Sequence, residues 1–417
     1  AELHARHAAF YAAFLLQRGP LLRGDNQKAA LEQIAEEFEN IRAAWGWAAD
    51  HGAVELLGQA MEPLYRFYEM RGWVREGEQA FDRAVTGLRS APIAGDGDLA
   101  LARLLGYQGE LAQRTGGYAT ARAALDESVA LARRQGGREE RAFGLCILGD
   151  IDRIQGDYDS ARRRLKESHA LFQILGNRPG MARALNNQGI VAGSQGQWAE
   201  AGDFFRRAIA IYQEFGEQRG IAKALNNLGI IAYMDGDHEG ASQLYGRSRA
   251  IYEELGDKIG LASSLNNLAI VAKELRRYDE ARDLNRRSLA MFREIGYQLG
   301  VMQVLKDLGD VAAAQGADDE ARDYFLQGLR TALRMGVLPV ALAMLVSLAP
   351  LLIARGRRHA ALAGLALATC HAAADGETRR RAEELLAEIA PAFDPALIAQ
   401  LRAEPPALEQ VAAEIDA

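Results

Sequence analysis

Apolar and small residues recur along the chain with a period of 40 residues. Sequence self-similarity at a fixed period of this size is typical of stacked supersecondary units. A leucine column runs through Leu105, Leu145, Leu185, Leu225, Leu265, Leu305 and Leu345. An alanine column runs through Ala121, Ala161, Ala201, Ala241, Ala281, Ala321 and Ala361. Seven registers without slippage predict a repeat array.

Glycines divide each unit into two halves. Turn glycines occupy Gly116, Gly156, Gly196, Gly236, Gly316 and Gly356, and Arg276 stands in the remaining place. Closing glycines occupy Gly136, Gly176, Gly216, Gly256, Gly296 and Gly336. Between them, apolar positions follow the i, i+3, i+4, i+7 spacing of one helix face, as in Leu225, Leu228, Gly229 and Ala232. The pattern predicts an all-α chain with two helices per unit.

Small residues at fixed positions indicate close helix packing. Gly229 and Ala241 fall where the two helices of one hairpin would approach, and a larger side chain would separate them. This alternation of small and large residues over about 100–379 resembles the tetratricopeptide repeat (TPR) family, with its unit lengthened to 40 residues. The resemblance implies an α-solenoid, a right-handed superhelix of helical hairpins.

The repeats suggest the domain organisation. We expect an N-terminal helical region with a degenerate hairpin and a linker at 1–98, six TPR units at 99–339, a degenerate seventh unit at 340–379, and capping helices at 380–417. A solenoid needs its last apolar face covered, which is the role predicted for the tail. The stretch 91–98 is the best linker candidate because it is rich in Gly, Pro and Asp.

The opening block contains two predicted helices before the hairpin at 53–90. The first has Phe10, Tyr11, Phe14 and Leu15 on one stripe and ends at Gly19-Pro20, and the second runs from Leu31 through Ala48. Three segments, at 3–11, 38–48 and 71–77, are similar in sequence and order to the helical arm of bacterial STAND-type transcriptional regulators. The resemblance implies a sensor that receives an inducer or partner protein, with the regulator's ATPase encoded upstream.

Charge and composition exclude several functions. The net charge is −7 and charged residues make up 25% of the chain, so we expect no direct nucleic-acid contact, which usually needs a basic surface. No apolar run is long enough for a membrane span. Cys146 and Cys370 lie in helical contexts rather than in a disulfide framework, which favours a cytoplasmic protein. The chain does not begin with Met, and we interpret it as a fragment.

No motif favours an enzyme, a metal or a cofactor. The sequence lacks a phosphate-binding Gly-x-x-x-x-Gly-Lys-Ser/Thr loop and a Gly-x-Ser-x-Gly nucleophile elbow. His4 and His7 lie three residues apart, but a second pair of ligands with zinc spacing is missing. We therefore predict a non-catalytic chain with no metal and no cofactor.

Paired asparagines give the candidate binding site. In TPR arrays the first helices line the concave surface, and the same first-helix position holds Asn186-Asn187, Asn226-Asn227 and Asn266-Asn267 in three successive units. An amide both donates and accepts, so such a ladder could hold a peptide backbone, or it could instead bond the backbone of the neighbouring repeat. Helical spacing adds further candidates to this surface: Arg183, Lys223, Tyr233, Lys273, Lys306 and Asp310. The cations would suit an acidic or carboxylate-bearing peptide.

Three functions fit these features. The first is the sensor arm of a signal-transduction regulator, which binds a peptide, a partner protein or an inducer in the concave groove. The second is a free-standing TPR adaptor, and the third is a small-molecule receptor that uses the same groove. The sequence leaves the ligand and any oligomerisation open.

Overall fold

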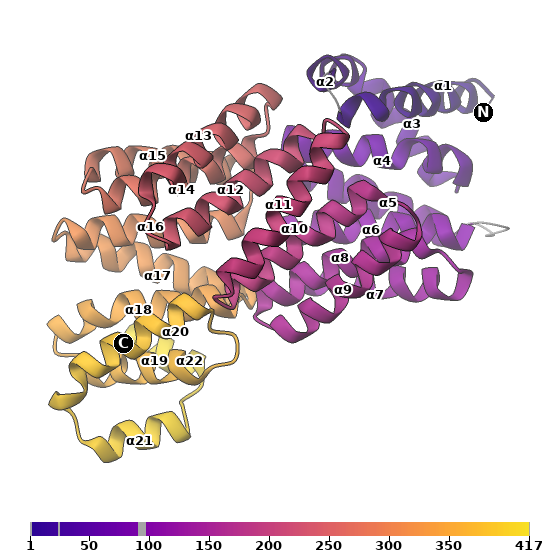
Figure 1. The fold of residues 1–417 in the computed structure, drawn as a ribbon. Helices are drawn as coiled ribbons and strands as arrows, with labels where there is room; N and C mark the ends of the chain where they lie inside the picture. The colour runs from indigo at the N-terminus through magenta and orange to yellow at the C-terminus, as the bar shows by residue number, and fades with distance from the viewer. Residues whose placement is uncertain (1, 24–25, 91–96, 417) are drawn as a thin grey trace.

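The computed structural model describes residues 2–23, 26–90 and 97–416. In these ranges the chain forms 22 α-helices and two short 3-10 helices, and no strand. The hairpins stack in chain order from α1 at one end of the molecule to α20–α22 at the other (Figure 1). The elements are α1 (Glu2–Arg18), η1 (Pro20–Arg23), α2 (Gln27–Glu36), α3 (Phe38–Asp50), α4 (Val54–Arg71), α5 (Val74–Ser90), α6 (Gly97–Thr115), α7 (Tyr118–Gln135), α8 (Arg138–Gln155), α9 (Tyr158–Ile174), α10 (Arg178–Ser194), α11 (Trp198–Glu214), α12 (Gln218–Met234), α13 (His238–Leu255), α14 (Lys258–Glu274), α15 (Tyr278–Ile295), α16 (Gln298–Ala314), α17 (Asp318–Met335), α18 (Leu338–Ala354), α19 (Arg358–Cys370), α20 (Gly376–Ile389), η2 (Ala390–Ala392), α21 (Pro395–Ala403) and α22 (Leu408–Asp416).

The turn and closing glycines end helices by adopting positive φ. Gly236 has φ 79° after α12, and Gly256 has φ 67° after α13. At the first of these turns, the Asp237 amide donates to the Ala232 carbonyl at 2.9 Å, which satisfies a carbonyl left open by the helix end. Arg276 adopts the same conformation, with φ 59°, and is the one non-glycine among the described residues with positive φ.

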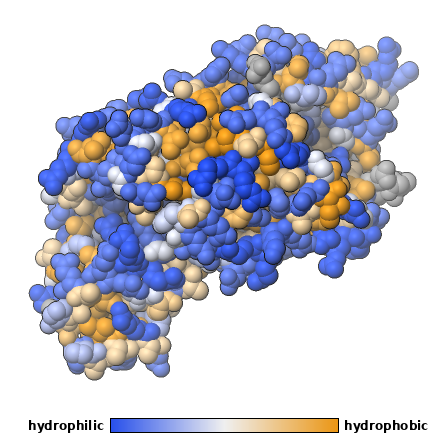
Figure 2. Space-filling model, in the orientation of Figure 1, coloured by the Kyte–Doolittle hydropathy of each residue, from blue (hydrophilic) through white to orange (hydrophobic). Residues whose placement is uncertain are grey.

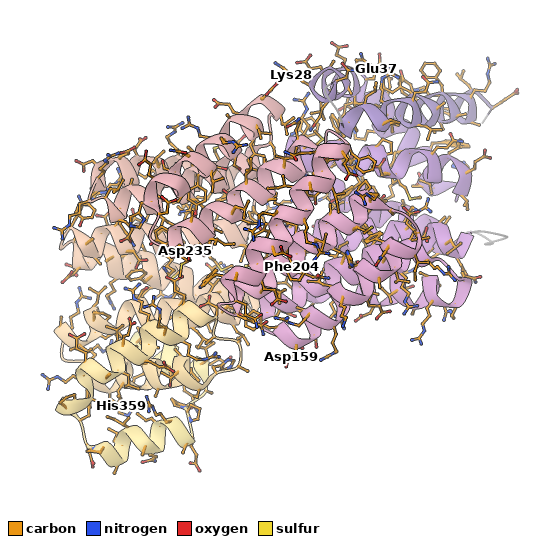
Figure 3. All side chains as sticks on the ribbon, in the orientation of Figure 1. Lys28, Glu37, Asp159, Phe204, Asp235 and His359 are labelled. Atoms are coloured by element: carbon orange, nitrogen blue, oxygen red, sulfur yellow. The ribbon has the colours of Figure 1, made fainter. Side chains whose placement is uncertain are left out.

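Small residues hold the two helices of each hairpin close together. A Cβ added at Gly229 of α12 would lie 2.5 Å from the ring of Tyr245 on α13, so only glycine fits there. Ala241 is fully buried in the same hairpin. Side chains fill the space between neighbouring hairpins (Figure 3), and the leucine column is buried along the array.

A serine column adds one buried hydrogen bond to most units. In four hairpins a hydroxyl on the second helix donates to a carbonyl 26 residues earlier on the first helix. The donors are Ser128, Ser168, Ser248 and Ser288. The other three units have Ala208, Gly328 and Ala368 in this position, which keeps the column small although these residues lack the hydroxyl.

The superhelix curls far enough for its early and late units to meet. The positive-φ glycines of early turns lie against apolar side chains of late turns: a Cβ at Gly72 would lie 3.4 Å from Ile295, and one at Gly116 would collide with Met335. The helix pairs α6–α16 and α8–α18 are also in contact. We call this contact between early and late units the seam.

The C-terminal tail caps the last hairpin and also reaches the seam. Leu386, Leu408 and Val411 join the apolar core of α18 and α19. The segment that connects α19 to α20 crosses to early units, where Ala373 packs against Gly156 and the Tyr158 hydroxyl donates to the Ala373 carbonyl at 3.4 Å.

The opening block differs from the sequence prediction in three ways. Phe10 is 62% exposed, whereas Ala8, Ala12 and Leu15 form the buried stripe of α1. The predicted second helix is two helices, α2 and α3, because the backbone at Glu37 leaves helical geometry with φ −98° and ψ 10°. Residues 91–96 of the predicted linker lie outside the described residues, and α6 already begins at Gly97.

None of the helices in the described ranges is long and apolar enough to cross a lipid bilayer.

Candidate functional site

First helices from both sides of the superhelix enclose a polar cavity of about 380 Å³, which we call the lumen cavity. The C-terminal halves of α4, α6 and α8 line one side, and the N-terminal halves of α10, α12 and α14 line the other. Its lining holds both signs of charge. The cations are Arg66, Arg114, Arg153, Arg183, Arg219 and Lys223, and the anions are Glu69, Glu110, Asp150, Glu217 and Asp257.

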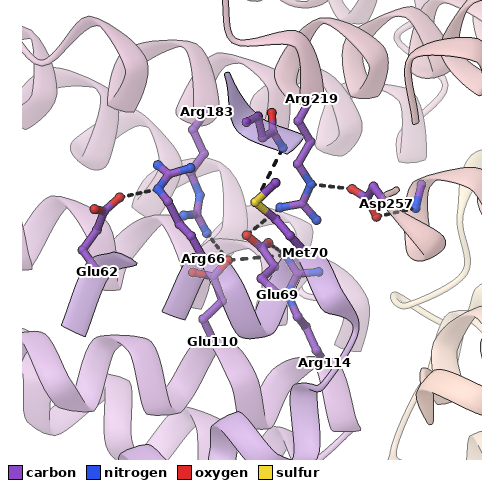
Figure 4. A network of polar contacts seen from close by, with 11 residues as sticks. Glu62, Arg66, Glu69, Met70, Glu110, Arg114, Arg183, Arg219 and Asp257 are labelled. Carbon is purple, nitrogen blue, oxygen red and sulfur yellow. Dashed lines mark hydrogen bonds and ion pairs between the residues drawn. The ribbon is translucent and has the colours of Figure 1, made fainter. Parts of the chain in front are cut away.

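A buried ion-pair network connects the two sides of the lumen cavity (Figure 4). Glu69 of α4 pairs with Arg114 of α6 and, at 2.5 Å, with Arg219 of α12. Arg219 also pairs at 2.5 Å with Asp257, which lies directly before α14. Burial opposes ionisation of Glu69, but the Arg114 and Arg219 guanidiniums outweigh it and hold the pKa of Glu69 well below its usual range.

Arg183 joins the network from α10. It pairs at 2.6 Å with Glu110 of α6 and lies over the ring of Phe143, with its Cζ 5.0 Å from the ring centroid. The predicted groove residue Arg183 therefore lines the lumen cavity, but a carboxylate of the same chain already neutralises it.

Lys223 differs from the arginines of the cavity because it has no close counter-ion in the described part of the chain. Its side chain is accessible to solvent through the cavity, and no carboxylate among the described residues lies within ion-pair distance of its ammonium. Asp150 attracts it from further away, but that carboxylate bonds to Arg153 at 2.8 Å and to Gln113 at 2.6 Å. The surrounding walls of the cavity remove part of its hydration, which lowers the pKa of Lys223 despite the attraction of Asp150. A partly desolvated cation without a close counter-ion favours the binding of an anion.

The asparagine pairs form a ladder between successive first helices. In each rung, residues 41 apart in sequence make one bond: Asn187 donates to Cys146 Sγ, Asn227 to Asn186, Asn267 to Asn226, and Asn266 to Asp307. The three oxygen-accepting rungs measure 3.1, 3.1 and 2.7 Å. The asparagines therefore bond the neighbouring repeat, but their partners are side chains instead of the backbone that the alternative named.

The ladder leaves part of its hydrogen-bonding capacity unused. Asn187 lines the lumen cavity, and its Oδ1 is buried without a hydrogen-bond partner among the described residues. Asn226 and Asn227 also line the cavity, and the rungs use only the Oδ1 of the first and the Nδ2 of the second. Oε2 of Glu110 and Nε of Arg114 are likewise buried and unpartnered within the described chain.

The structure separates the predicted site residues into three groups. Five of them line the lumen cavity: Arg183, Asn187, Lys223, Asn226 and Asn227. Asn186 and Asn266 are buried in the ladder, and Asn267 forms a rung beside them. The other four lie further along the array and have partners within the chain, which are Glu274 for Tyr233 and Lys273, and each other for Lys306 and Asp310.

Sequence reasoning missed most of the ion-pair network. Glu69, Arg114 and Arg219 do not belong to any repeating column, and the positions that correspond to Arg219 in the adjacent units are Pro179 and Ile259. The repeats gave no clear signal for it, because another charged residue, Glu139, also stands in the column of Arg219. The described residues contain no group of three or more His, Cys, Asp or Glu side chains placed to hold a metal ion.

Comparison with known proteins identifies the repeats. The sequence profile described as tetratricopeptide repeat matches residues 100–174, 180–254 and 260–334, together 225 of the 417 residues. No curated protein matches the chain.

Solved structures share the fold at low sequence identity. A Rap protein complexed with competence and sporulation factor is 14% identical, with a TM-score of 0.57 over 87% of this chain and 99% of the other. A signal transduction ATPase with numerous domains (STAND) and a tetratricopeptide repeat sensor, from Pyrococcus horikoshii, is also 14% identical, with a TM-score of 0.50 over 90% of this chain and 53% of the other.

Proposed function

The chain belongs to the tetratricopeptide repeat family, and from this premise we propose that it is a non-catalytic sensor that binds the carboxylate of a peptide or partner protein in its lumen cavity. Lys223 supplies the charge, and the free amide atoms of Asn187, Asn226 and Asn227 supply hydrogen bonds to the adjoining backbone. Asn186, Asn266 and Asn267 act indirectly by holding the first helices in register.

The unpaired Lys223 carries this proposal. Around it, Glu69, Asp257 and Asp150 are each bonded to arginine, so the cavity contains one cation that a ligand can neutralise without breaking an existing ion pair. A hydrogen bond between an ammonium and a carboxylate contributes about 1.5–3 kcal/mol, which is roughly a tenfold to hundredfold change in affinity.

A second candidate function is a receptor for a small organic acid. The volume of about 380 Å³ falls in the range of small-molecule sites. Both candidates place the carboxylate at Lys223, and they differ in whether the Asn amides contact a peptide backbone. Thermal-shift measurements with individual organic acids separate them, since a ligand that binds only the folded state raises the melting temperature.

The sensor context is part of the proposal. The similarity of 1–90 to the arm of STAND-type regulators, together with the fold shared with a STAND sensor, supports a cytoplasmic bacterial regulator. We expect the reading frame upstream of residue 1 to encode an ATPase. A reading frame that begins at a Met next to residue 1 would favour a free-standing adaptor instead.

Peptide capture tests the binding site. Synthetic hexapeptide pools with free or amidated C-termini are incubated with the protein, and the retained peptides are identified by mass spectrometry after gel filtration. We expect the wild type to retain free-carboxylate peptides and Lys223→Gln to retain at least tenfold less. The matched control is Lys166→Gln, an exposed lysine on α9 that lines none of the cavities described. Equal retention by Lys223→Gln and the wild type would exclude the lumen cavity as the site.

A further inference from the structure

A second hollow, of about 170 Å³, opens next to the lumen cavity. Asn227 lines both, so the two are adjacent on α12. The hollow has an apolar floor made by side chains of α10, α11 and α12, and we call it the apolar pocket. These side chains are Ile190, Trp198, Phe205, Ile230 and Ile231. Figure 2 shows apolar side chains gathered around α11 to α13 on an otherwise largely hydrophilic face.

The start of the cap helix forms the rim of the apolar pocket. Asp375 and Glu377 both line it, from either side of Gly376. Gly376 packs against the α10–α11 turn, where an added Cβ would lie 3.3 Å from the Gly196 amide nitrogen. The tail therefore brings two carboxylates to a pocket that is otherwise built by the repeats.

These carboxylates have no cation of their own. Asp375 accepts a hydrogen bond from the Thr378 amide at 2.7 Å, as the N-cap of α20, and Glu377 is exposed. Neither makes an ion pair within the described chain. The negative charge of Glu377 contributes to the raised pKa of Lys306, but that lysine is bonded to Asp310 at 2.9 Å. The rim is therefore an acidic position that an external cation can occupy.

Spacing along α12 relates the pocket to the lumen cavity. Lys223, Asn227 and Ile230 follow one another at about one-turn intervals on the same face, and the rise of 1.5 Å per residue places Ile230 about 10 Å beyond Lys223. An extended chain covers about 3.4 Å per residue, so this distance corresponds to about three ligand residues. The order along α12 is thus cation, amide and apolar surface, followed by the acidic rim from α20.

We propose that the apolar pocket is a side-chain subsite for a peptide whose carboxylate lies at Lys223. The subsite takes an apolar side chain about three residues before the carboxylate and a basic group next to it, which pairs with Glu377 and Asp375. This inference rests on the proposed function and makes the cap helix part of the binding site. The free carboxylate and the basic group fix the direction of the peptide.

Defined peptide pools test the subsite on the full chain. The reference pool is Xaa-Lys-Leu-Xaa-Xaa-Xaa with a free carboxylate, and matched pools carry Gln in place of Lys or Ser in place of Leu. We expect the wild type to retain the reference pool about tenfold better than either matched pool, the discrimination that one well-fitting contact provides. Glu377→Lys should lose the preference for Lys over Gln, and Ile230→Ser the preference for Leu over Ser.

Controls separate the possible results. Glu388→Lys changes an exposed glutamate on the same helix, outside the pocket, and should keep both preferences. If the wild type retains carboxylate peptides regardless of Lys and Leu, the subsite is wrong while the proposed function stands. If no pool is retained, both fail. If Glu377→Lys keeps the Lys preference, the acidic rim does not contact the ligand.

Discussion

Arg276 adopts the left-handed backbone conformation that glycine adopts at the equivalent turn of the other units. With φ 59°, it occupies the turn between α14 and α15, where a side chain places its Cβ close to the carbonyl. Its side chain is exposed and makes no ion pair within the described residues, so the position gains little from being arginine.

We expect Arg276→Gly to stabilise the chain by about 0.5–1 kcal/mol, because relief of the left-handed strain outweighs the larger entropy of an unfolded glycine. Urea unfolding measures the change. The reverse test is Gly236→Ala, which should cost about 1 kcal/mol at the equivalent turn. A destabilising Arg276→Gly would show that the arginine side chain contributes a contact that outweighs the strain.

At the scale of the helices, the Asn ladder determines how one hairpin follows the next. A fully buried rung lies between α14 and α16, where Asn266 donates to both Asp307, at 2.7 Å, and Asn285, at 2.9 Å. Burial raises the pKa of Asp307, and the Lys306 ammonium and the Asn266 bond oppose part of that rise, so this amide helps to stabilise a buried carboxylate.

Asn266→Ala should therefore cost about 1–3 kcal/mol, since it leaves two buried acceptors without their donor. Asn267→Ala removes one rung at a half-buried position and should cost about 0.5–1 kcal/mol. Both values come from urea unfolding. Equal costs for the two variants would show that the ladder contributes only its packing.

The elements themselves could be predicted from the sequence because they repeat. Columns of leucine, alanine and glycine determined the period, the two helices per unit and the close approach at Gly229. The ladder was only half predictable, because Asn227 and Asn186 stand 41 residues apart and a 40-residue alignment pairs each with its own column instead. The ion pairs of the lumen and the pocket at Glu377 depend on the curl of the whole array, which no single unit encodes.

For the whole molecule, Glu69 joins segments that are far apart in the chain. It connects α4 to α6 and α12 from within the lumen. Because its folded pKa is below the unfolded value of about 4.3, its contribution is fully present above that pH and is lost as the pH falls below it.

Glu69→Gln should cost about 3 kcal/mol at pH 7, since two buried guanidiniums lose their counter-ion. It should also flatten the fall in melting temperature between pH 5 and about pH 3, because the titrating group is gone. The matched control is Glu127→Gln, which removes a surface ion pair with Arg89 and should leave the acid profile unchanged. Identical acid profiles for the two variants would contradict the role given to Glu69.

The seam has a consequence for how such a chain can evolve. Solenoids commonly gain and lose whole repeats, because each unit touches only its neighbours. Here Met335 lies against Gly116, 219 residues earlier, which is about five and a half units. Duplicating or deleting one unit between Gly116 and Met335 would keep the 40-residue register of every column. It would nevertheless place a different turn against Gly116. The number of repeats is therefore under selection together with their sequence, unlike in an open array.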